Sequence, residues 1–173
     1  MLDKIRDMIG DANVLTGPDR AKWLTEWTGS YTVDPMAVLR PANTDQVAAI
    51  MALAHETHTP VVPVSGNTGL TGGTSGTGML MLSLDRLNTI ADIDTAGRTA
   101  TVGAGVILSN LHDAADTHDL IFPLTFGARG SARIGGVLST NGGGSNLVRY
   151  GNSRDLVLWL QVVRAARTSP AMR

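Results

Sequence analysis

Several common functional groups are missing from this chain of 173 residues. It has no cysteine, which excludes disulfides, thiolate zinc sites and a cysteine nucleophile. Aromatic residues make up only 4% of the sequence, which argues against a surface on which nucleic-acid bases stack. The net charge of −1 provides no overall field for a polyanion. No segment is apolar enough to predict a membrane span or a secretory signal, so we expect a cytoplasmic protein without a nucleic-acid partner.

Glycine, in contrast, is abundant and is concentrated in two segments. Of the 20 glycines, 14 lie in Gly66–Gly78 or Gly127–Gly151. The first segment contains PVSGNTGLTGG (Pro63–Gly73), within a stretch, residues 59–84, that has no charged side chain. Successive backbone N–H groups in such a turn form a concavity that binds phosphate oxygens. One such loop could be an ordinary long turn, but two of this density indicate ligand-binding loops, one in each half of the chain.

The charge distribution around the second glycine segment is one-sided. No acidic residue lies between Asp119 and Asp155, whereas four arginines do, namely Arg129, Arg133, Arg149 and Arg154. They could be scattered surface arginines or a wall that faces an anion. Their position inside the second glycine segment favours the wall.

The first half of the chain predicts a β–α–β unit. The expected elements are a helix from residue 2 that ends at Gly10, a strand at Met36–Leu39, a helix capped by Asn43 or Thr44 with Gln46 in the capping-box position and ending near His58, and a strand at Thr59–Val64. Such a unit predicts a parallel pair of strands joined by a crossover helix.

The second half predicts further strands and one helix. The expected elements are strands at Met79–Leu84, Leu87–Ile93 and Arg98–Val102, the last two joined by a turn at residues 94–97, then a helix capped by Ser109, and a last strand at Leu156–Val163. Together the two halves indicate an α+β fold with two lobes.

Two groups of side chains outside the glycine segments are interpreted as structural. The aromatic group, expected to pack rather than to form a ligand cage, is Trp23, Trp27 and Tyr31. The histidine group is His55 and His58 at the end of the first long helix and His112 and His118 on the second. No further ligand cluster accompanies them, so we expect no metal site.

Familiar nucleotide and hydrolase motifs do not occur. The first glycine loop is followed by a strand rather than a helix, so it does not match the G-x-G-x-x-G dinucleotide motif. No Gly-Lys-Ser/Thr of a phosphate-binding P-loop occurs, nor do G-x-S-x-G or H-E-x-x-H.

The loop VVPVSGNTGLTGG (Val61–Gly73) resembles the pyrophosphate-binding loop of FAD-linked oxidoreductases with the vanillyl-alcohol oxidase/PCMH fold. The resemblance is greatest to the branch that holds D-2-hydroxyglutarate dehydrogenase, D-lactate dehydrogenase and the glycolate oxidase subunit. Further segments agree in order and spacing: LSLDRLNTIADID (Leu82–Asp94), TVGAGVILSNL (Thr101–Leu111), FPLTFGARGSARIGGVLSTNGGG (Phe122–Gly144) and RYGNSRDLVLWLQVV (Arg149–Val163). The similarity extends from Pro35 to Val163.

The resemblance implies an FAD between two α+β lobes, a βαβ lobe and a second mixed or antiparallel lobe. The residues expected to hold the pyrophosphate are Ser65, Gly66, Asn67, Thr68, Gly69 and Gly72. Those expected along the adenosine and ribityl path are Pro123, Gly127, Gly130, Ser131, Ile134, Gly135, Gly136, Thr140, Asn141 and Gly144. Covalent members of the fold place a histidine where Asn67 stands, so the resemblance implies non-covalent FAD.

The resemblance also implies an incomplete, C-terminally truncated domain. We expect a helical lead-in at residues 1–34, an FAD-binding part at 35–163 with a lobe boundary near residue 95, and an unmatched, disordered tail at 164–173. Trp159 and Gln161 depart from the family pattern, which usually has glycine and glutamate there. The abrupt end of the match at Val163 favours a shifted reading frame as the origin of the tail. In the family, the substrate-binding arginine and the metal-binding histidines lie beyond this point, so no catalytic residue is assigned.

Three functional hypotheses remain open. The first is a fragment, inactive alone, of a dehydrogenase that transfers hydride from a small 2-hydroxy acid to FAD and passes the electrons to an acceptor. The second is a stand-alone module that binds FAD or a nucleotide without redox turnover. The third is a non-functional remnant that folds poorly, because truncation would expose apolar surface and an unpaired sheet edge.

Overall fold

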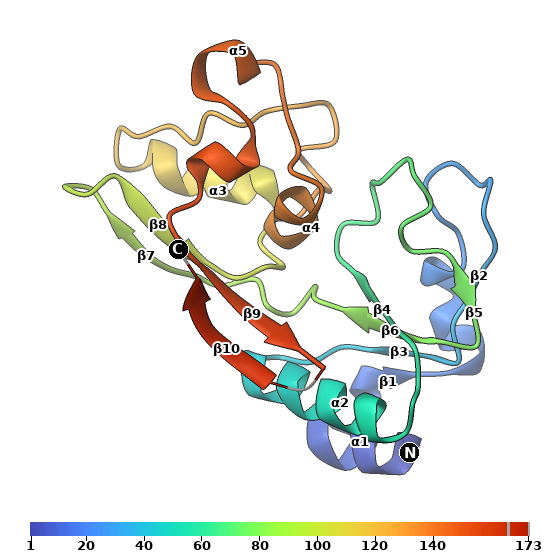
Figure 1. Cartoon of the computed structure of the whole chain (residues 1–173). Helices are drawn as coiled ribbons and strands as arrows, with labels where there is room; N and C mark the ends of the chain where they lie inside the picture. The colour runs from blue at the N-terminus through green and yellow to red at the C-terminus, as the bar shows by residue number, and fades with distance from the viewer. Residues whose placement is uncertain (166, 173) are drawn as a thin grey trace.

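A four-stranded sheet forms the centre of the first lobe in the computed structural model, which describes residues 1–165 and 167–172 (Figure 1). In spatial order the strands are β1 (Val14–Leu15), β3 (Ala37–Leu39), β6 (Leu80–Ser83) and β4 (Val61–Val64). β3 and β4 each pair with β6 in parallel, whereas β1 pairs with β3 in the antiparallel sense. The three longer strands were predicted, but β3 and β4 do not pair with each other, because β6 lies between them.

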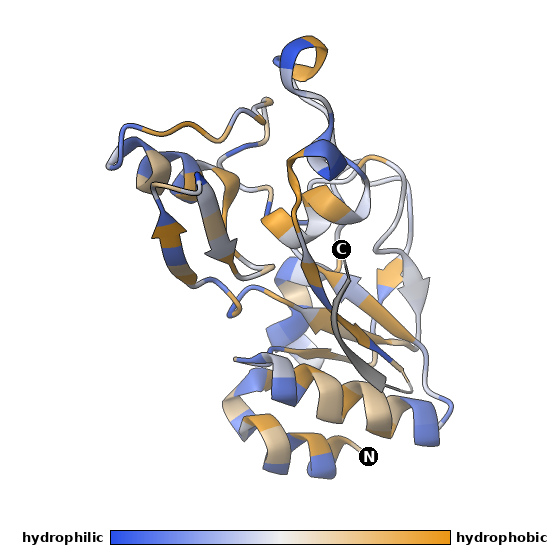
Figure 2. Cartoon of the chain, turned by 60° about the vertical axis from the view of Figure 1, so that its left-hand side comes forward, coloured by the Kyte–Doolittle hydropathy of each residue, from blue (hydrophilic) through white to orange (hydrophobic). Residues whose placement is uncertain are grey.

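β6 takes the central position because both of its faces are buried. Leu80 and Leu82 pack on the side of the sheet that the helices cover, and Met81 packs on the opposite side. Strands that are buried on both faces are continuously apolar rather than alternating. Figure 2 shows that the central strands of this sheet are largely hydrophobic.

Two helices, α1 (Leu2–Ile9) and α2 (Thr44–Glu56), cover one face of the sheet (Figure 1). α2 begins as predicted: the Asn43 side chain accepts a hydrogen bond from the backbone N–H of Gln46 at 2.9 Å, and the Gln46 side chain accepts one from the N–H of Ala42 at 2.7 Å. Ile50 of α2 is fully buried against Ile5 of α1 and the sheet. Among the described residues, no helix has the length and apolar character needed to cross a membrane.

The opposite face of the sheet is covered by the segment that leads from β1 to β3. It contains a 3-10 helix at Gly17–Trp23 and β2 (Val33–Asp34), which pairs in parallel with β5 (Gly76–Thr77). Trp23 packs there against Val38 and Met81 and is only 7% exposed. Trp23 is therefore a packing residue, as predicted.

The second lobe combines a hairpin with short helices. Its elements are β7 (Ile90–Asp94), β8 (Thr99–Val102), α3 (Leu108–Asp116), α4 (Ile134–Ser139) and α5 (Leu147–Tyr150). β7 and β8 pair in the antiparallel sense, as predicted, and residue 95, near which we expected the lobe boundary, lies in their turn. Val106, Leu111 and Ile134 form the core between hairpin and helices.

The prediction that Ser109 caps α3 is wrong. The helix begins one residue earlier, at Leu108, and no side chain caps it. Backbone carbonyls of the second glycine segment take that role: the N–H of Leu108 donates to Ala132 O at 2.9 Å, and the N–H of Ser109 donates to Arg129 O at 3.1 Å. The start of α3 therefore holds the glycine segment in place.

The chain ends in an antiparallel hairpin of β9 (Leu160–Arg164) and β10 (Arg167–Met172). The strand predicted from Leu156 starts later, because Ser153–Leu156 form a 3-10 helix. Val163 packs against the core of the first lobe. β10 pairs with β9 within the segment 164–173, for which we expected disorder; residues 166 and 173 lie outside the described residues.

The lobes meet where the chain leaves β6. A Cβ on Gly105 would overlap the carbonyl oxygen of Leu84, so only a glycine allows this approach of the two backbones. The Arg133 guanidinium donates to the carbonyl oxygens of Asp85 at 3.2 Å and Gly105 at 2.5 Å. The Asp85 carboxylate in turn accepts hydrogen bonds from Arg40 at 3.3, 3.1 and 2.8 Å. Burial alone would raise the pKa of Asp85, but the hydrogen bonds from Arg40 and the charges of Arg40 and Arg133 outweigh it and lower that pKa.

Candidate functional site

The first glycine loop connects β4 to β5 and presents free backbone donors. Within the part of the chain that the structure describes, the N–H groups of residues 66–71 have no acceptor. Consecutive N–H groups of this kind suit the oxygens of a phosphate or pyrophosphate. The loop therefore has the donors that its glycine pattern predicts for an anion.

The two glycine loops, far apart in sequence, touch each other. A Cβ on Gly66 would overlap the carbonyl oxygen of Ser131, and a Cβ on Gly136 would lie 3.4 Å from the Cβ of Ser65. The Ser65 hydroxyl is buried and has no hydrogen-bond partner among the described residues. A buried polar atom without a partner is costly, and a bound group that supplies the partner is one explanation. The structure thus brings the predicted residues Ser65, Gly66, Ser131 and Gly136 together.

A hollow of about 250 Å³ lies where the loops meet. It is lined by Trp27, Thr68, Gly127, Ala128, Gly130 and Ser131. A Cβ added to Gly127 or Gly130 would meet no other atom within 4 Å, and the same holds for Gly69 in the first loop. These three glycines are therefore not required for packing, in contrast to Gly66.

The N-terminal segment forms a third side of this hollow, which the sequence patterns did not predict. Trp27 lines the hollow and is 66% exposed, and Tyr31 is 47% exposed. A Cβ on Gly72, whose φ is +67°, would lie 2.9 Å from the Tyr31 ring. The prediction that these aromatics pack does not hold for Trp27, whose ring lines the hollow and is exposed, whereas the half-exposed Tyr31 ring lies against Gly72. The order Glu26, Trp27, Thr28, Gly29 could have indicated the turn that exposes Trp27, because a carboxylate shortly before a threonine and a glycine is typical of a tight turn.

Glu26 organises this turn. Its side chain is buried and accepts hydrogen bonds from the Thr28 hydroxyl at 2.5 Å and from the backbone N–H groups of Thr28 at 2.7 Å, Ser30 at 2.6 Å and Tyr31 at 3.2 Å. The Thr28 hydroxyl, with these N–H groups, lowers the pKa of Glu26 below its ordinary value of 4.5. The turn between Thr25 and Tyr31 is therefore fixed around an ionised carboxylate.

We expect Glu26→Gln to destabilise the protein at neutral pH and to reduce the pH dependence of its stability. A carboxylate with a depressed pKa stabilises the fold above its unfolded pKa and loses this contribution as the pH falls through the folded pKa. Urea midpoints measured from about pH 7 down to pH 3 should therefore fall less in the variant than in the wild type. The exposed Glu56→Gln is the control. The same pH dependence in both variants would contradict the role of Glu26.

Asn67 connects the first loop to the N-terminal turn. Its φ is +51°, a conformation that asparagine tolerates better than most residues. Its side-chain amide donates to the carbonyl oxygen of Thr25 at 3.0 Å, and its side-chain oxygen accepts a hydrogen bond from the Thr74 hydroxyl at 2.9 Å. Both polar ends of this side chain are thus used within the protein, where they hold the loop.

Other predicted site residues make contacts within the second lobe. The Thr140 hydroxyl donates to the carbonyl oxygen of Gly136 at 3.2 Å. The side-chain oxygen of Asn141 accepts from the N–H of Arg154 at 3.0 Å. A Cβ on Gly144 would overlap a backbone carbonyl of the same lobe. These residues therefore support the backbone of the second loop.

The last three predicted residues lie at the start of α4 and near α5. The carbonyl oxygen of Pro123 accepts a hydrogen bond from the Asn146 side chain at 2.9 Å. Ile134 is buried in the core of the second lobe. A Cβ on Gly135 would lie 2.8 Å from the Cβ of Ala104, so this glycine serves close packing. None of the three lines the hollow between the loops.

The four arginines of the second segment do not form one wall. The side chain of Arg133 is bound at the lobe junction, as described above, and the Arg149 guanidinium lies 5.1 Å from the centre of the Tyr150 ring. Arg129 and Arg154 are exposed. The anion-facing interpretation is wrong for Arg133, because its guanidinium faces backbone carbonyls.

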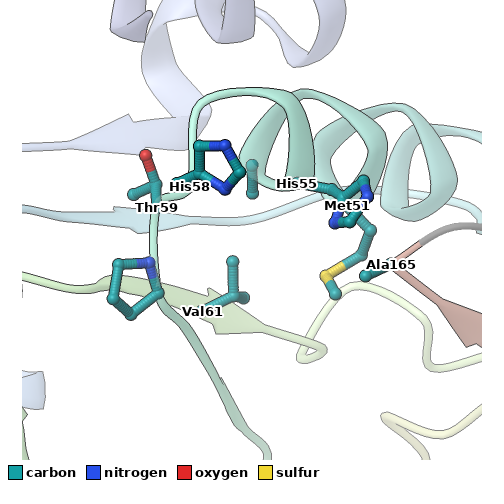
Figure 3. Close-up of a pocket in the computed structure, with 8 residues that line it drawn as sticks. Met51, His55, His58, Thr59, Val61 and Ala165 are labelled. Carbon is teal, nitrogen blue, oxygen red and sulfur yellow. The ribbon is translucent and has the colours of Figure 1, made fainter.

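A larger hollow, about 350 Å³, lies beside the end of α2 (Figure 3). His55 and His58 line it together with Met51, Val61 and Ala165, and both histidines are exposed, as predicted. No residue of the two glycine segments, Gly66–Gly78 and Gly127–Gly151, lines this hollow. Among the residues that the structure describes, no three His, Cys, Asp or Glu side chains gather as a metal site would require.

The other two histidines do not contribute to the site either. His112 lies on α3, and one of its ring nitrogens, Nε2, is 2.8 Å from the carbonyl oxygen of Leu124. The prediction that His118 lies on the same helix is wrong, because α3 ends at Asp116 and His118 follows it. We therefore assign the candidate site to the junction of the two glycine loops.

Comparisons with known proteins show which proteins this chain is similar to. The chain is 43% identical over 139 residues to D-2-hydroxyglutarate dehydrogenase of Xanthomonas citri pv. viticola, a match that covers 80% of this chain and 29% of the relative. It is 40% identical over 157 residues to the mitochondrial D-2-hydroxyglutarate dehydrogenase of Danio rerio, with 87% of this chain and 29% of the relative covered. The chain thus spans about a third of the length of these curated relatives.

The fold is shared with solved structures. Alkyldihydroxyacetonephosphate synthase superimposes with a TM-score of 0.88 at 15% identity, covering 97% of this chain and 33% of that chain. The family model described as "FAD binding domain" matches residues 35–167, which include both glycine loops. Since this match covers most of the chain, the chain belongs to the family of PCMH-type FAD-binding domains.

Proposed function

We propose that this chain holds FAD non-covalently between its two glycine loops, as the flavin-binding part of a 2-hydroxyacid dehydrogenase. The observation that carries the proposal is that, among the described residues, the N–H groups of residues 66–71 and the buried hydroxyl of Ser65 beside them have no hydrogen-bond partner. Oxygens of a pyrophosphate would supply the acceptors that these donors lack. Across from these donors, the second lobe leaves open space at Gly127 and Gly130.

The residues present fit such a cofactor in both shape and chemistry. The N–H groups of Gly66, Asn67, Thr68 and Gly69 would bind the pyrophosphate, and Gly127, Gly130 and Ser131 would bound the path of the remaining dinucleotide. When bound, the flavin supplies the hydride acceptor for the oxidation of a hydroxy acid, and an electron acceptor then reoxidises it. The protein's own part is to orient the cofactor and to exclude water from the loop junction.

The substrate class rests on the relatives. Both are named D-2-hydroxyglutarate dehydrogenase, and this chain covers about a third of each. A small D-2-hydroxy acid is therefore the proposed substrate of the whole protein. Within the described residues, we assign no side chain to substrate binding or proton transfer, so we propose that the chain alone binds FAD without turnover.

A titration with FAD tests the proposal. We expect saturable binding, seen as a change in flavin fluorescence, and release of the flavin into the supernatant when the protein is precipitated with acid. Reduction of a dye by D-2-hydroxyglutarate or D-lactate should be absent. Flavin that stays with the precipitate would disprove non-covalent binding, and a lack of binding would disprove the function proposed for the loops.

A stand-alone nucleotide-binding module is the second candidate. It is favoured by the presence of both loops, with their mutual contacts, within the 173 residues. The two candidates differ in their effect on redox activity. Dye reduction that appears when this chain is combined with the remaining two thirds of a related dehydrogenase would favour the dehydrogenase, whereas flavin binding without such complementation would favour the module.

A further inference from the structure

Trp27 is the one large aromatic side chain among the residues that line the hollow between the glycine loops. It precedes residues 35–167, which the FAD-binding family model matches. We propose that Trp27 is an aromatic platform on which a planar ring of the bound dinucleotide stacks. The inference rests on the proposed function, because it needs FAD at the loop junction.

Exposure separates Trp27 from the neighbouring tryptophan. Trp23 is 7% exposed and packs beneath the sheet, whereas Trp27 is 66% exposed and faces the hollow. Leaving so large an apolar ring in water forgoes the free energy that its burial would provide. An exposed aromatic in a concave site that also has polar donors is a feature of ligand-binding surfaces.

The turn that carries Trp27 is held from both sides. On one side, the buried carboxylate of Glu26 accepts the N–H groups of the following residues, which fixes the backbone around Trp27. On the other side, Asn67 of the first loop donates to the carbonyl oxygen of Thr25. The backbone that carries the ring is therefore positioned relative to the first loop before any ligand binds, which lowers the entropic cost of stacking.

The surface opposite Trp27 is suited to a flat group. Gly127 and Gly130 line the hollow without a Cβ, and a Cβ at either would point into free space. Because these glycines have no side chains, a planar ring has room between them and the Trp27 ring. Adenine and the isoalloxazine each have a π face that can stack on tryptophan. The geometry therefore identifies a planar ring as the ligand group but does not distinguish between these two rings.

Direct binding measurements with three variants test the platform. Trp27→Ala should weaken FAD binding about tenfold, and Trp27→Phe, which keeps a ring, should remain within about threefold of the wild type. Trp159→Ala is the matched control: Trp159 is also half-exposed but lines neither hollow, and its loss should leave affinity unchanged. Urea unfolding of each variant shows whether it retains the fold.

Shorter ligands distinguish the two rings of FAD. If the isoalloxazine stacks, Trp27→Ala weakens FMN binding and leaves ADP binding unchanged; if adenine stacks, the reverse holds. FAD affinity that is equal in Trp27→Ala and the wild type would overturn the inference while the proposed function stands. A wild-type chain that binds none of the three ligands would overturn both.

Discussion

Replacement of Gly66 by alanine should unfold or severely destabilise the protein. The added Cβ would overlap the carbonyl oxygen of Ser131 and lie 3.0 Å from the Cα of Ala132, and both are backbone atoms of the other lobe. Backbone cannot rotate away as a flexible side chain can. We expect a loss of about 3 kcal/mol, the upper end of the cost of overpacking, against a total stability of about 5–15 kcal/mol. Urea denaturation measures this loss.

Gly69→Ala is the matched control for this prediction. Gly69 lies in the same loop, has no positive φ, and an added Cβ would meet no atom within 4 Å. Its urea midpoint should therefore equal that of the wild type. Equal midpoints for Gly66→Ala and Gly69→Ala would show that the two loops do not pack as the structure has them.

Gly69→Val should abolish FAD binding while the fold remains intact. The fold has room for the new side chain, because nothing surrounds the position. The same free space is where the proposed pyrophosphate would approach the N–H groups of residues 66–71. We expect the dissociation constant to rise about a hundredfold or more, equivalent to about 2.8 kcal/mol, as measured by flavin fluorescence.

Gly73→Val provides the comparison within the same loop. Gly73 is also exposed and also has open space where a Cβ would lie, but it is outside the predicted set of cofactor-binding residues. Its affinity for FAD should remain near that of the wild type. If both valine variants bind FAD as the wild type does, Gly69 does not belong to the site.

Local signals in the sequence predicted most of the elements but not the order of the strands. Asn43 and Gln46 identify the start of α2, and the uninterrupted apolar run around Met81 predicts a buried strand. The insertion of β6 between β3 and β4 depends on contacts between residues about 20 to 40 positions apart, which no local pattern records. The cap of α3 was missed for the same reason, because carbonyls at least 20 residues away provide it.

Only part of the candidate site could be predicted, because some of its contacts leave no signal in the local sequence. Glycine density identified both loops, since a shortage of side chains is visible in the sequence alone. The role of Trp27 depends on the direction in which the turn at Glu26 points its ring, and periodicity cannot show this. Arg133 was misjudged because its residue type suggests an anion, whereas its actual partners are backbone carbonyls, which carry no residue-specific signal.

The junction at Gly105 and Arg133 has a consequence for how a cofactor enters. The close approach of the two backbones at Gly105 and the Arg133 hydrogen bonds beside it oppose a rotation of one lobe away from the other. Proteins that close around a ligand through a hinge have lower association rates, because binding requires that motion. With FAD as the proposed ligand, entry into the hollow of about 250 Å³ between the loops would need no hinge motion, so we expect the temperature dependence of its association rate to be that of a loop motion and not of a domain motion.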